Sequence, residues 1–437
     1  MACTRTSIRA AAEVLAVLGV APAASAQLAS ASATSLALGD NYTALARGYN
    51  AVNWNPAGLG MPDNPPFSFA FAGTGTGGTG PISLGDFKQY GGVAVPNAVL
   101  ASWLARVQAQ GGQSFDVDGA ASMAMSIGNI GFQLSTDAYE RGKLNPDAVQ
   151  VLLYGNAGLT GSAQDMNFQG SRTEAAVATT AALGFGRRVD FGVGPTTQHF
   201  SLGATVKYIV GNALLFGEDA GSVLQASPLA VDVRFPMVQS DTSFNRVPQH
   251  GHGLGVDVGA AWQSGPLSAG VTIQNFVNTF HWDVSQMYFR PGGAVFGGSA
   301  TRSTSFDAVS MSALPDSLKA QAAALAADIE GMHFTPSMNV GVAMKVLPFL
   351  TATGDLRQQL GDGMHLGDRT HLGAGAELRI IPFLPVRAGV AGISGGYIVS
   401  AGAGLELFFF HLNAGVAERK TQYGSYPGGA VTISLGQ

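Results

Sequence analysis

Residues 337–346, with the sequence SMNVGVAMKV, decide the fold of this chain. Large apolar side chains occupy every second position from Met338 to Val346, and small or polar residues fill the positions between them. A period of two places alternate side chains on opposite faces of a β-strand. The second face carries a single charge, Lys345, whereas the outer face of a soluble sheet would be densely charged. The pattern therefore indicates a membrane strand whose apolar face meets lipid and whose polar face lines a lumen.

The same alternation recurs along most of the chain. It predicts an all-β fold, a transmembrane antiparallel β-barrel of about 14 strands with short helices in its external loops. The expected strands are residues 66–72, 119–127, 129–136, 173–186, 198–210, 251–263, 265–276, 336–347, 348–358, 369–380, 382–393, 397–407, 409–418 and 429–436.

The connections between these segments alternate in length, as the periplasmic turns and external loops of outer-membrane barrels do. Tight periplasmic turns are expected near Gly128, Ser264, Leu347-Pro348, Ile381 and Phe408, with a longer one at 187–197. Long external connections are expected at 73–118, 137–172, 211–250 and 277–335. Within them, helical spacing predicts helices over 97–110 and 314–329, which we expect to cap the external mouth. The glycine-rich run Gly73 to Gly80 lacks the features of a phosphate-binding loop and is expected to be a flexible loop.

Composition excludes several classes of protein. Of 437 residues only 12% are charged, and the net charge is −5. Lys and Arg are not clustered as nucleic-acid binding requires, and the apolar content is too high for disorder. The longest apolar run, Val14 to Ala24, is too short for a transmembrane helix and lies in a segment, residues 1–26, that reads as a secretory signal peptide. Its Cys3 is the only cysteine, so we expect no disulfide and no thiolate chemistry in the mature protein.

Charged residues on the polar strand faces are the candidate binding residues. Alternation directs eight of them into the lumen: Asp257, Lys345, Asp355, Arg357, Glu377, Arg379, Arg387 and Glu406. One interpretation is that they pair across the lumen, because buried charges persist chiefly when they are paired. The other is that Arg357, Arg379 and Arg387 form a cationic patch for an anionic head group, since planar guanidinium groups suit carboxylates. The two interpretations are compatible.

Catalytic and metal sites are not indicated. No nucleophile elbow of the G-x-S-x-G type occurs, and His250 and His252 have no third ligand placed by the sequence to complete a metal site. We therefore expect no enzyme activity, no metal and no cofactor.

Two N-terminal stretches resemble a known family. Residues 41–48 (NYTALARG) and 51–59 (AVNWNPAGL) are similar to the start of the long-chain fatty-acid transporter superfamily, the FadL/TodX-like proteins and their PorV-like relatives. Weaker matches are residues 253–259, 269–275 and 400–407. The resemblance implies a 14-stranded barrel, residues 66–437, whose N-terminal segment, residues 27–65, folds into the lumen as a plug. Asn55, Pro56 and Ala57 would be part of that plug.

The resemblance also implies a function and a location. Proteins of this family take up hydrophobic small molecules through external loops and release them sideways into the bacterial outer membrane without an energy source. The expected partners are such a substrate, outer-membrane lipids and the barrel-assembly machinery. A PorV-like barrel that binds secreted proteins or has a structural role is the alternative. A third hypothesis, a secreted soluble adhesin, predicts densely charged strand faces, and residues 337–380 show the opposite.

Overall fold

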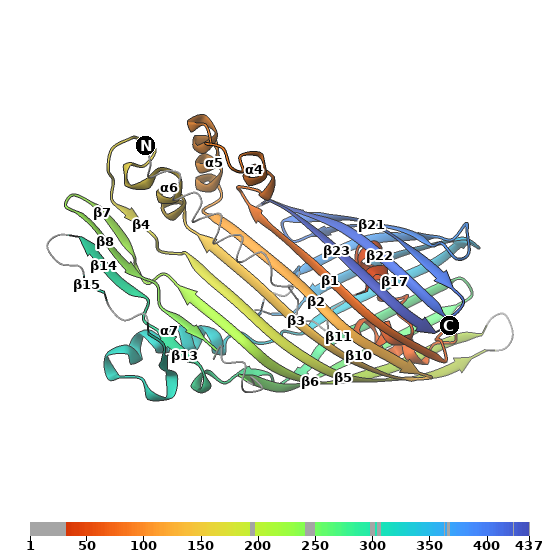
Figure 1. Cartoon of the computed structure of the whole chain (residues 1–437). Helices are drawn as coiled ribbons and strands as arrows, with labels where there is room; N and C mark the ends of the chain where they lie inside the picture. Colours follow the sequence, from red (N-terminus) through yellow and green to blue (C-terminus); the bar gives the residue numbers. More distant parts are fainter. Residues whose placement is uncertain are drawn as a thin grey trace.

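Fourteen long strands form a closed antiparallel barrel (Figure 1). The computed structural model describes residues 32–192, 197–240, 250–297, 302–303, 307–361, 363–364, 368–422 and 424–436; the expected signal peptide lies outside them. The barrel strands are β1 (Phe67–Gly80), β2 (Gln113–Ile127), β3 (Ile130–Leu144), β5 (Arg172–Phe191), β6 (Gln198–Glu218), β10 (Gly251–Ser264), β11 (Leu267–Asn278), β17 (Ser337–Leu347), β18 (Leu350–Gln359), β19 (Thr370–Leu378), β20 (Val386–Ile393), β21 (Gly396–Leu407), β22 (Phe410–Thr421) and β23 (Gly424–Gly436). The expected fold is confirmed.

Pairing of the first and last strands closes the wall. Phe71 of β1 lies opposite Ile433 of β23, and the other edge of β1 pairs with β2 over its whole length. A closed ladder leaves no strand edge unpaired, which is what the hydrocarbon core of a membrane requires of a β-structure. None of the described helices is long and apolar enough to span a membrane.

The two faces of the wall follow the predicted alternation. On β20, Val386, Ala388 and Val390 point outward and are exposed, whereas the intervening Arg387 and Gly389 are buried inside. Exposed Val, Leu, Ile and Phe residues continue around the outer surface of the other strands. Their number is far above what a soluble protein exposes in one continuous surface, and they form the lipid-facing band of a membrane barrel.

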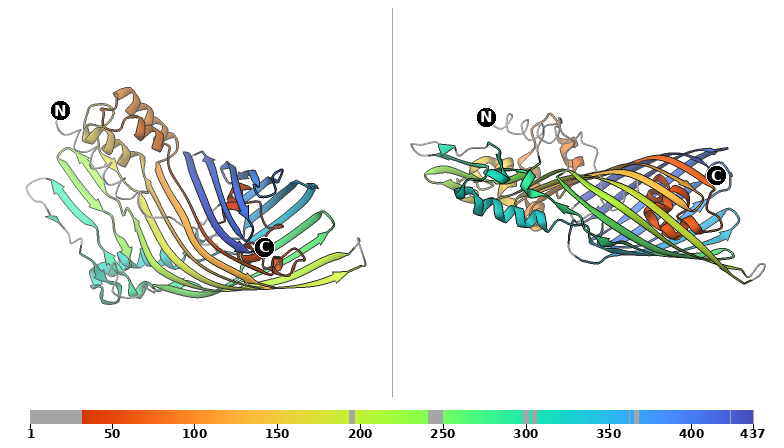
Figure 2. Two further views of the ribbon diagram at one scale, coloured as in Figure 1. Left: turned by 45° about the vertical axis from the view of Figure 1, so that its right-hand side comes forward. Right: turned by 90° about the horizontal axis from the view of Figure 1, so that it is seen from below.

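The wall is much taller on one side than on the other. β5 and β6 have 20 and 21 residues, whereas β19 and β20 have 9 and 8. Figure 2 shows the long strands rising beyond the barrel proper toward the external helices. The barrel wall around β5 and β6 is therefore the tall half-wall, and it extends beside the external segments.

Two sequence expectations need correction. The run Gly73 to Gly80 is not a loop, because it belongs to β1 and is hydrogen-bonded on both sides, to β2 and β23. Thr74 and Thr76 also donate their hydroxyls to the carbonyls of Gly429 and Pro427. More generally, β1, β2, β3 and β6 extend past their predicted external ends. These external parts leave the membrane, so they no longer need apolar alternation and the pattern could not reveal them. β5 instead extends past its predicted periplasmic end, to Phe191.

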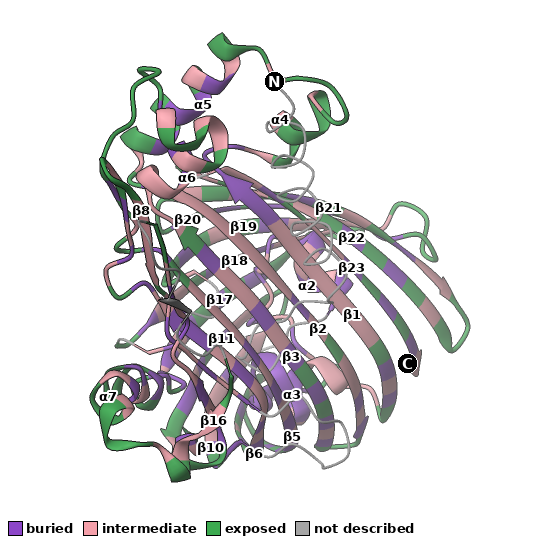
Figure 3. Ribbon diagram, turned by 60° about the vertical axis from the view of Figure 1, so that its left-hand side comes forward, coloured by how far each residue is buried: buried purple, intermediate pink, exposed green. Residues whose placement is uncertain are grey.

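The N-terminal segment lies inside the barrel (Figures 2 and 3). It consists of four short helices, α2 (Ala33–Ala37), η1 (Gly48–Asn50), α3 (Ala51–Trp54) and η2 (Pro56–Gly60). Inward glycines let this plug approach the wall closely. A Cβ built on Gly389 would lie 2.1 Å from the carbonyl carbon of Leu38, and one on Gly203 would lie 2.3 Å from that of Pro56.

The external connections build a cap beside the tall half-wall. Its helices are α4 (Leu84–Gln89), α5 (Asn97–Ala109), α6 (Pro146–Tyr154), η3 (Gly155–Ala157), η5 (Val284–Gln286), η6 (Met311–Ala313) and α7 (Asp316–Glu330). Its strands are β4 (Met166–Asn167), β7 (Val223–Ala226), β8 (Leu229–Arg234), β9 (Met237–Gln239), β12 (His281–Trp282), β13 (Tyr288–Arg290), β14 (Gly293–Gly297), β15 (Arg302–Ser303) and β16 (Val309–Ser310). The two predicted external helices correspond to α5 and α7, which confirms them. The predicted tight turns near Gly128, Ser264, Leu347-Pro348 and Phe408 are confirmed. The connection near Ile381 is longer than predicted, because it spans the seven residues 379–385, and residues 187–191 of the longer predicted turn belong to β5.

Candidate functional site: the plugged lumen

The plug is fastened to the wall at points around its circumference. Asp355 of β18 accepts hydrogen bonds from the backbone N–H groups of Tyr42 and Thr43, at 3.0 and 2.8 Å. On another side, the N–H of Ala33 donates to the hydroxyl of Thr432 in β23 at 2.9 Å. The Asp355 bonds are charge-assisted and therefore stronger than ordinary backbone hydrogen bonds.

The Asn55-Pro56-Ala57 motif forms a third attachment. The Asn55 side chain accepts a hydrogen bond from the N–H of Ala57 and donates one to the carbonyl of Ala260 in β10, both at 3.1 Å. It thereby caps η2 and binds the wall with the same amide. Pro56 stands at the start of η2, where its missing N–H has no cost, and Ala57 is fully buried.

Two cavities among the described residues of the lumen bear on function. The first, of about 410 Å³, is lined by periplasmic strand ends and by plug residues that include Leu45 and 47–50. The second, of about 180 Å³, lies on the external side of the plug and is lined by Trp54, Arg357, His371, Arg419 and Tyr426 among others. We call them the periplasmic cavity and the external cavity.

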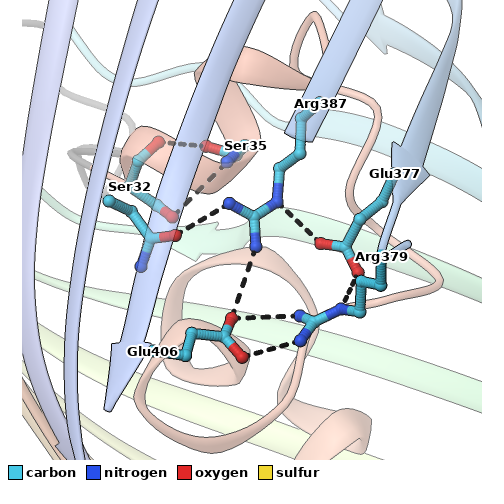
Figure 4. A network of polar contacts seen from close by, with 7 residues as sticks. Ser32, Ser35, Glu377, Arg379, Arg387 and Glu406 are labelled. Atoms are coloured by element: carbon cyan, nitrogen blue, oxygen red, sulfur yellow. Dashed lines mark hydrogen bonds and ion pairs between the residues drawn. The ribbon is translucent and has the colours of Figure 1, made fainter. Parts of the chain in front are cut away.

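Four of the predicted charges form a neutral network on the wall of the periplasmic cavity (Figure 4). Arg379 binds Glu377 at 2.5 Å and Glu406 at 2.6 Å, and Arg387 binds Glu377 at 2.7 Å and approaches Glu406 at 3.8 Å. Arg387 also donates to the side-chain oxygen of Asn413 at 2.7 Å. The network contains two cations and two anions, so it has no net charge. With Asn413 it links β19, β20, β21 and β22. Lys345 lines the same cavity and has no ion pair among the described residues.

Arg357 lies apart from these residues, in the external cavity. Its guanidinium carbon is 5.2 Å from the centre of the Trp54 ring, within the range of a cation–π contact. A guanidinium nitrogen also donates to the carbonyl of Asp40 at 3.5 Å. Within the described part of the chain, no carboxylate oxygen lies within 4 Å of this guanidinium, and its Nε has no hydrogen-bond partner.

The structure thus places all eight predicted charges on the lumenal side but does not bring the three arginines together. Arg357 is separated by the plug from Arg379 and Arg387. The single cationic patch considered from the sequence is therefore wrong as a geometric arrangement. Alternation fixes which face a residue occupies, but it does not fix depth along the barrel or the position of the plug.

Asp257 belongs to a buried cluster that sequence reasoning found only in part. The Nζ of Lys207 in β6 lies 2.6 Å from Asp257 Oδ1 and 2.5 Å from Asn275 Oδ1. Asn275 lies at an irregularity in the pairing of β10 with β11 and has a positive φ of 53°. The sequence does single out Lys207, because it is the only Lys or Arg in the predicted membrane strand 198–210.

Within the described residues no group of three or more His, Cys, Asp or Glu side chains is arranged to hold a metal. His250 is buried immediately before β10, whereas His252 is exposed and its ring lies 5.1 Å from that of His281.

The external cap has a buried apolar core, the most extensive apolar cluster among the described residues. Ile329 and Leu325 of α7, with Phe289 and Trp282, pack against residues of the tall half-wall such as Phe216. A second cluster joins α5 and α6 around Trp103. An apolar core outside the membrane lies directly beside the external mouth of the lumen.

Comparison with known proteins identifies the fold. Residues 86–281 match the model of a family described as the TraF protein of the F plasmid transfer operon. The search of curated proteins gave no match. Among solved structures, the toluene transporter TodX of Pseudomonas putida is similar over 95% of this chain and 99% of its own, with 10% identity and a TM-score of 0.50. The Ralstonia pickettii toluene transporter TbuX is similar over 92% of this chain and 97% of its own, with 13% identity and a TM-score of 0.49. A Pseudomonas aeruginosa FadL homologue is similar over 92% of this chain and 96% of its own, with 10% identity and a TM-score of 0.48.

At these identities the likeness to TodX shows the fold alone, and at that level the expected resemblance to FadL/TodX-like barrels is confirmed. A closed β-barrel with an apolar outer band and this fold is a protein of the bacterial outer membrane, as predicted.

Proposed function

We propose that this protein carries small molecules with a hydrophobic body from the cell exterior into the outer membrane by passive diffusion. Long-chain fatty acids are the substrate we favour. The names of the barrels with a similar fold support transport of hydrophobic compounds: TodX and TbuX are described as toluene transporters.

The observation that carries the choice of an acid is the position of Arg357. Its guanidinium faces the external cavity beside Trp54, with Leu36 and Ile398 also lining the space. This cavity combines aromatic and aliphatic residues with two guanidinium groups. Because Arg419 is paired with Asp368 at 2.7 Å, Arg357 is the one left to meet a carboxylate at the end of an apolar chain. The other two predicted arginines are already neutralised by Glu377 and Glu406, so they offer less to an anion.

The test measures binding and uptake of a radiolabelled long-chain fatty acid by liposomes that contain the purified barrel. Arg357→Gln should weaken fatty-acid binding by about tenfold to a hundredfold, the loss expected for a hydrogen bond to a charged group. It should leave binding of the methyl ester of the same acid nearly unchanged, because the ester has no carboxylate. Arg357→Lys is the matched variant that retains the charge. An equal loss for acid and ester would contradict a head-group role for Arg357.

A second function is favoured by a separate observation. The TraF family model matches 86–281, which includes most of α4 and all of α5, α6 and β7 to β9 of the external cap. A barrel that serves a transfer or secretion apparatus would use this cap to bind protein. Correctly inserted barrel that takes up neither the acid nor its ester would favour this alternative.

A further inference from the structure

Two neighbouring periplasmic turns are built from large apolar side chains. Between β19 and β20, Ile380, Ile381, Phe383 and Leu384 are all exposed, Ile380 by 70%. Between β21 and β22, Phe408 is 89% exposed and Phe409 is 67% exposed. Turns that face water are normally formed by Gly, Asn, Asp, Ser and Pro. We call residues 380–384 and 408–409 the apolar turn pair.

The strands above one of these turns are too short to cross the apolar part of a membrane. At about 3.4 Å per residue and a tilt of about 40°, the 8 residues of β20 rise about 21 Å. The apolar band of outer-membrane barrels is about 25 Å tall. Since all outward residues of β20 from Val386 to Gly392 are apolar or glycine, the band must continue beyond this strand.

The neighbouring β22 shows on which side it continues. Its outward residues from Phe410 to Val416 are apolar, and the next two outward residues toward the exterior are the exposed Glu418 and Lys420. These charges set the outer boundary of the band. The nine residues from Val416 down to Phe408 rise about 23 Å with the same geometry, so the band is completed only when the turn itself is included.

The conformation of the turn agrees with this. Phe408 has a φ of +53°, a left-handed conformation that Gly or Asn adopts readily and that bulky residues rarely adopt. A large aromatic residue at this position is poorly suited to the backbone but well suited to a lipid interface, where outer-membrane barrels carry their aromatic girdles.

We infer that the apolar turn pair is immersed in the inner leaflet of the outer membrane, in contact with lipid acyl chains near the headgroup boundary. The surface is continuous with the lipid-facing band of β20 and β22, and it supplies the height that these strands lack. The β5–β6 hairpin, by contrast, carries the exposed charged residues Arg187, Arg188 and Asp190.

The test places one fluorescent label on the barrel in lipid nanodiscs, where both membrane faces are accessible. Cys3, the only cysteine, is replaced by Ser, and bimane is attached at Phe409→Cys. Val390→Cys, in the middle of the band, is the lipid control, and Arg188→Cys is the water control. Each label is quenched in parallel by spin-labelled phosphatidylcholine and by iodide. Because Cys replaces an exposed side chain in each case, all three variants should fold, which heat-modifiable gel migration verifies.

We expect the lipid spin label to quench the 409 label within about twofold of the 390 label, and iodide to quench it far less than the 188 label. Quenching of the 409 label by iodide as strong as at 188 would overturn the inference. Protection from both quenchers would overturn it as well, because the surface would then be covered by protein.

Discussion

Lys207 Nζ lies 2.6 Å from Asp257 Oδ1 inside the barrel wall, and neither side chain is more than 3% exposed. The N–H of Asn275 donates to the same carboxylate oxygen at 2.7 Å, so the pair holds β6, β10 and the irregular part of β11 together. Removal of one partner from a buried ion pair leaves an uncompensated charge, which is usually more costly than loss of both.

Lys207→Met should therefore destabilise the barrel by about 3–5 kcal/mol. The double variant Lys207→Met/Asp257→Asn should recover much of that loss, since the amide keeps an acceptor for Asn275 without a charge. Urea unfolding in lipid vesicles measures both. A double variant less stable than Lys207→Met alone would show that the pair has a different role.

Plug anchoring by Asp355 gives a second prediction. Asp355→Ala removes the acceptor of the Tyr42 and Thr43 N–H groups and should loosen the plug without opening the wall. We expect greater permeability of liposomes to small sugars, measured by swelling, and a smaller increase for Asp355→Asn, which retains one acceptor oxygen. Unchanged permeability for Asp355→Ala would mean that the remaining attachments suffice.

Two glycines of β20, one facing the plug and one facing outward, provide a matched pair of variants. A Cβ on Gly389 would lie 2.1 Å from the plug backbone, whereas one on Gly392, which faces outward, meets nothing closer than 3.9 Å. Gly389→Ala should displace the plug and increase proteolysis of residues 32–60 in the folded barrel. Gly392→Ala should resemble the wild type. Similar protease resistance of the two variants would show that the plug shifts without loss of packing.

The external cap should respond to acid through Asp86 of α4. Partial burial raises the pKa of Asp86, but hydrogen bonds from the Ser83 backbone and hydroxyl, together with Arg106, outweigh it, so the pKa lies below its usual value. The stabilisation is therefore present above a pH of about 4 and is lost as the pH falls through the lowered pKa. Hydrogen exchange of α4 amides, corrected for intrinsic rates, should show protection at pH 5 that declines below pH 4. Asp86→Asn should abolish this pH dependence.

Much of the barrel could be predicted from the sequence because lipid contact imposes a strict rule. From Thr370 to Gly375 of β19, each outward residue is more exposed than its inward neighbours, as alternation predicts. The rule ends where the membrane ends, so the paired run Gly73 to Gly80 resembled a loop. Glycine and threonine carry no hydrophobic pattern, and only the neighbouring strands make that segment a strand.

The candidate site was predicted by face but not by depth. Glu377 and Arg387 are cross-strand neighbours, a relationship that depends on register, which a sequence of alternating residues does not specify. Arg357 is divided from them by a plug whose path depends on contacts such as Asn55 with Ala260, 205 residues apart. Long-range contacts of this kind leave no local pattern.

The hydrogen bond between Ala33 and Thr432 joins the two ends of the chain, and this affects how the barrel can assemble. The plug precedes β1, and Thr432 lies in β23, the strand that seals the barrel against β1. The N-terminal segment is synthesised first, yet its binding partner is synthesised last, so the plug cannot be fully seated until the final seam forms. If the barrel closed first, the N-terminal segment would have to enter a lumen that is already enclosed by all fourteen strands. Entry of the plug and sealing of the barrel must therefore be coordinated during insertion.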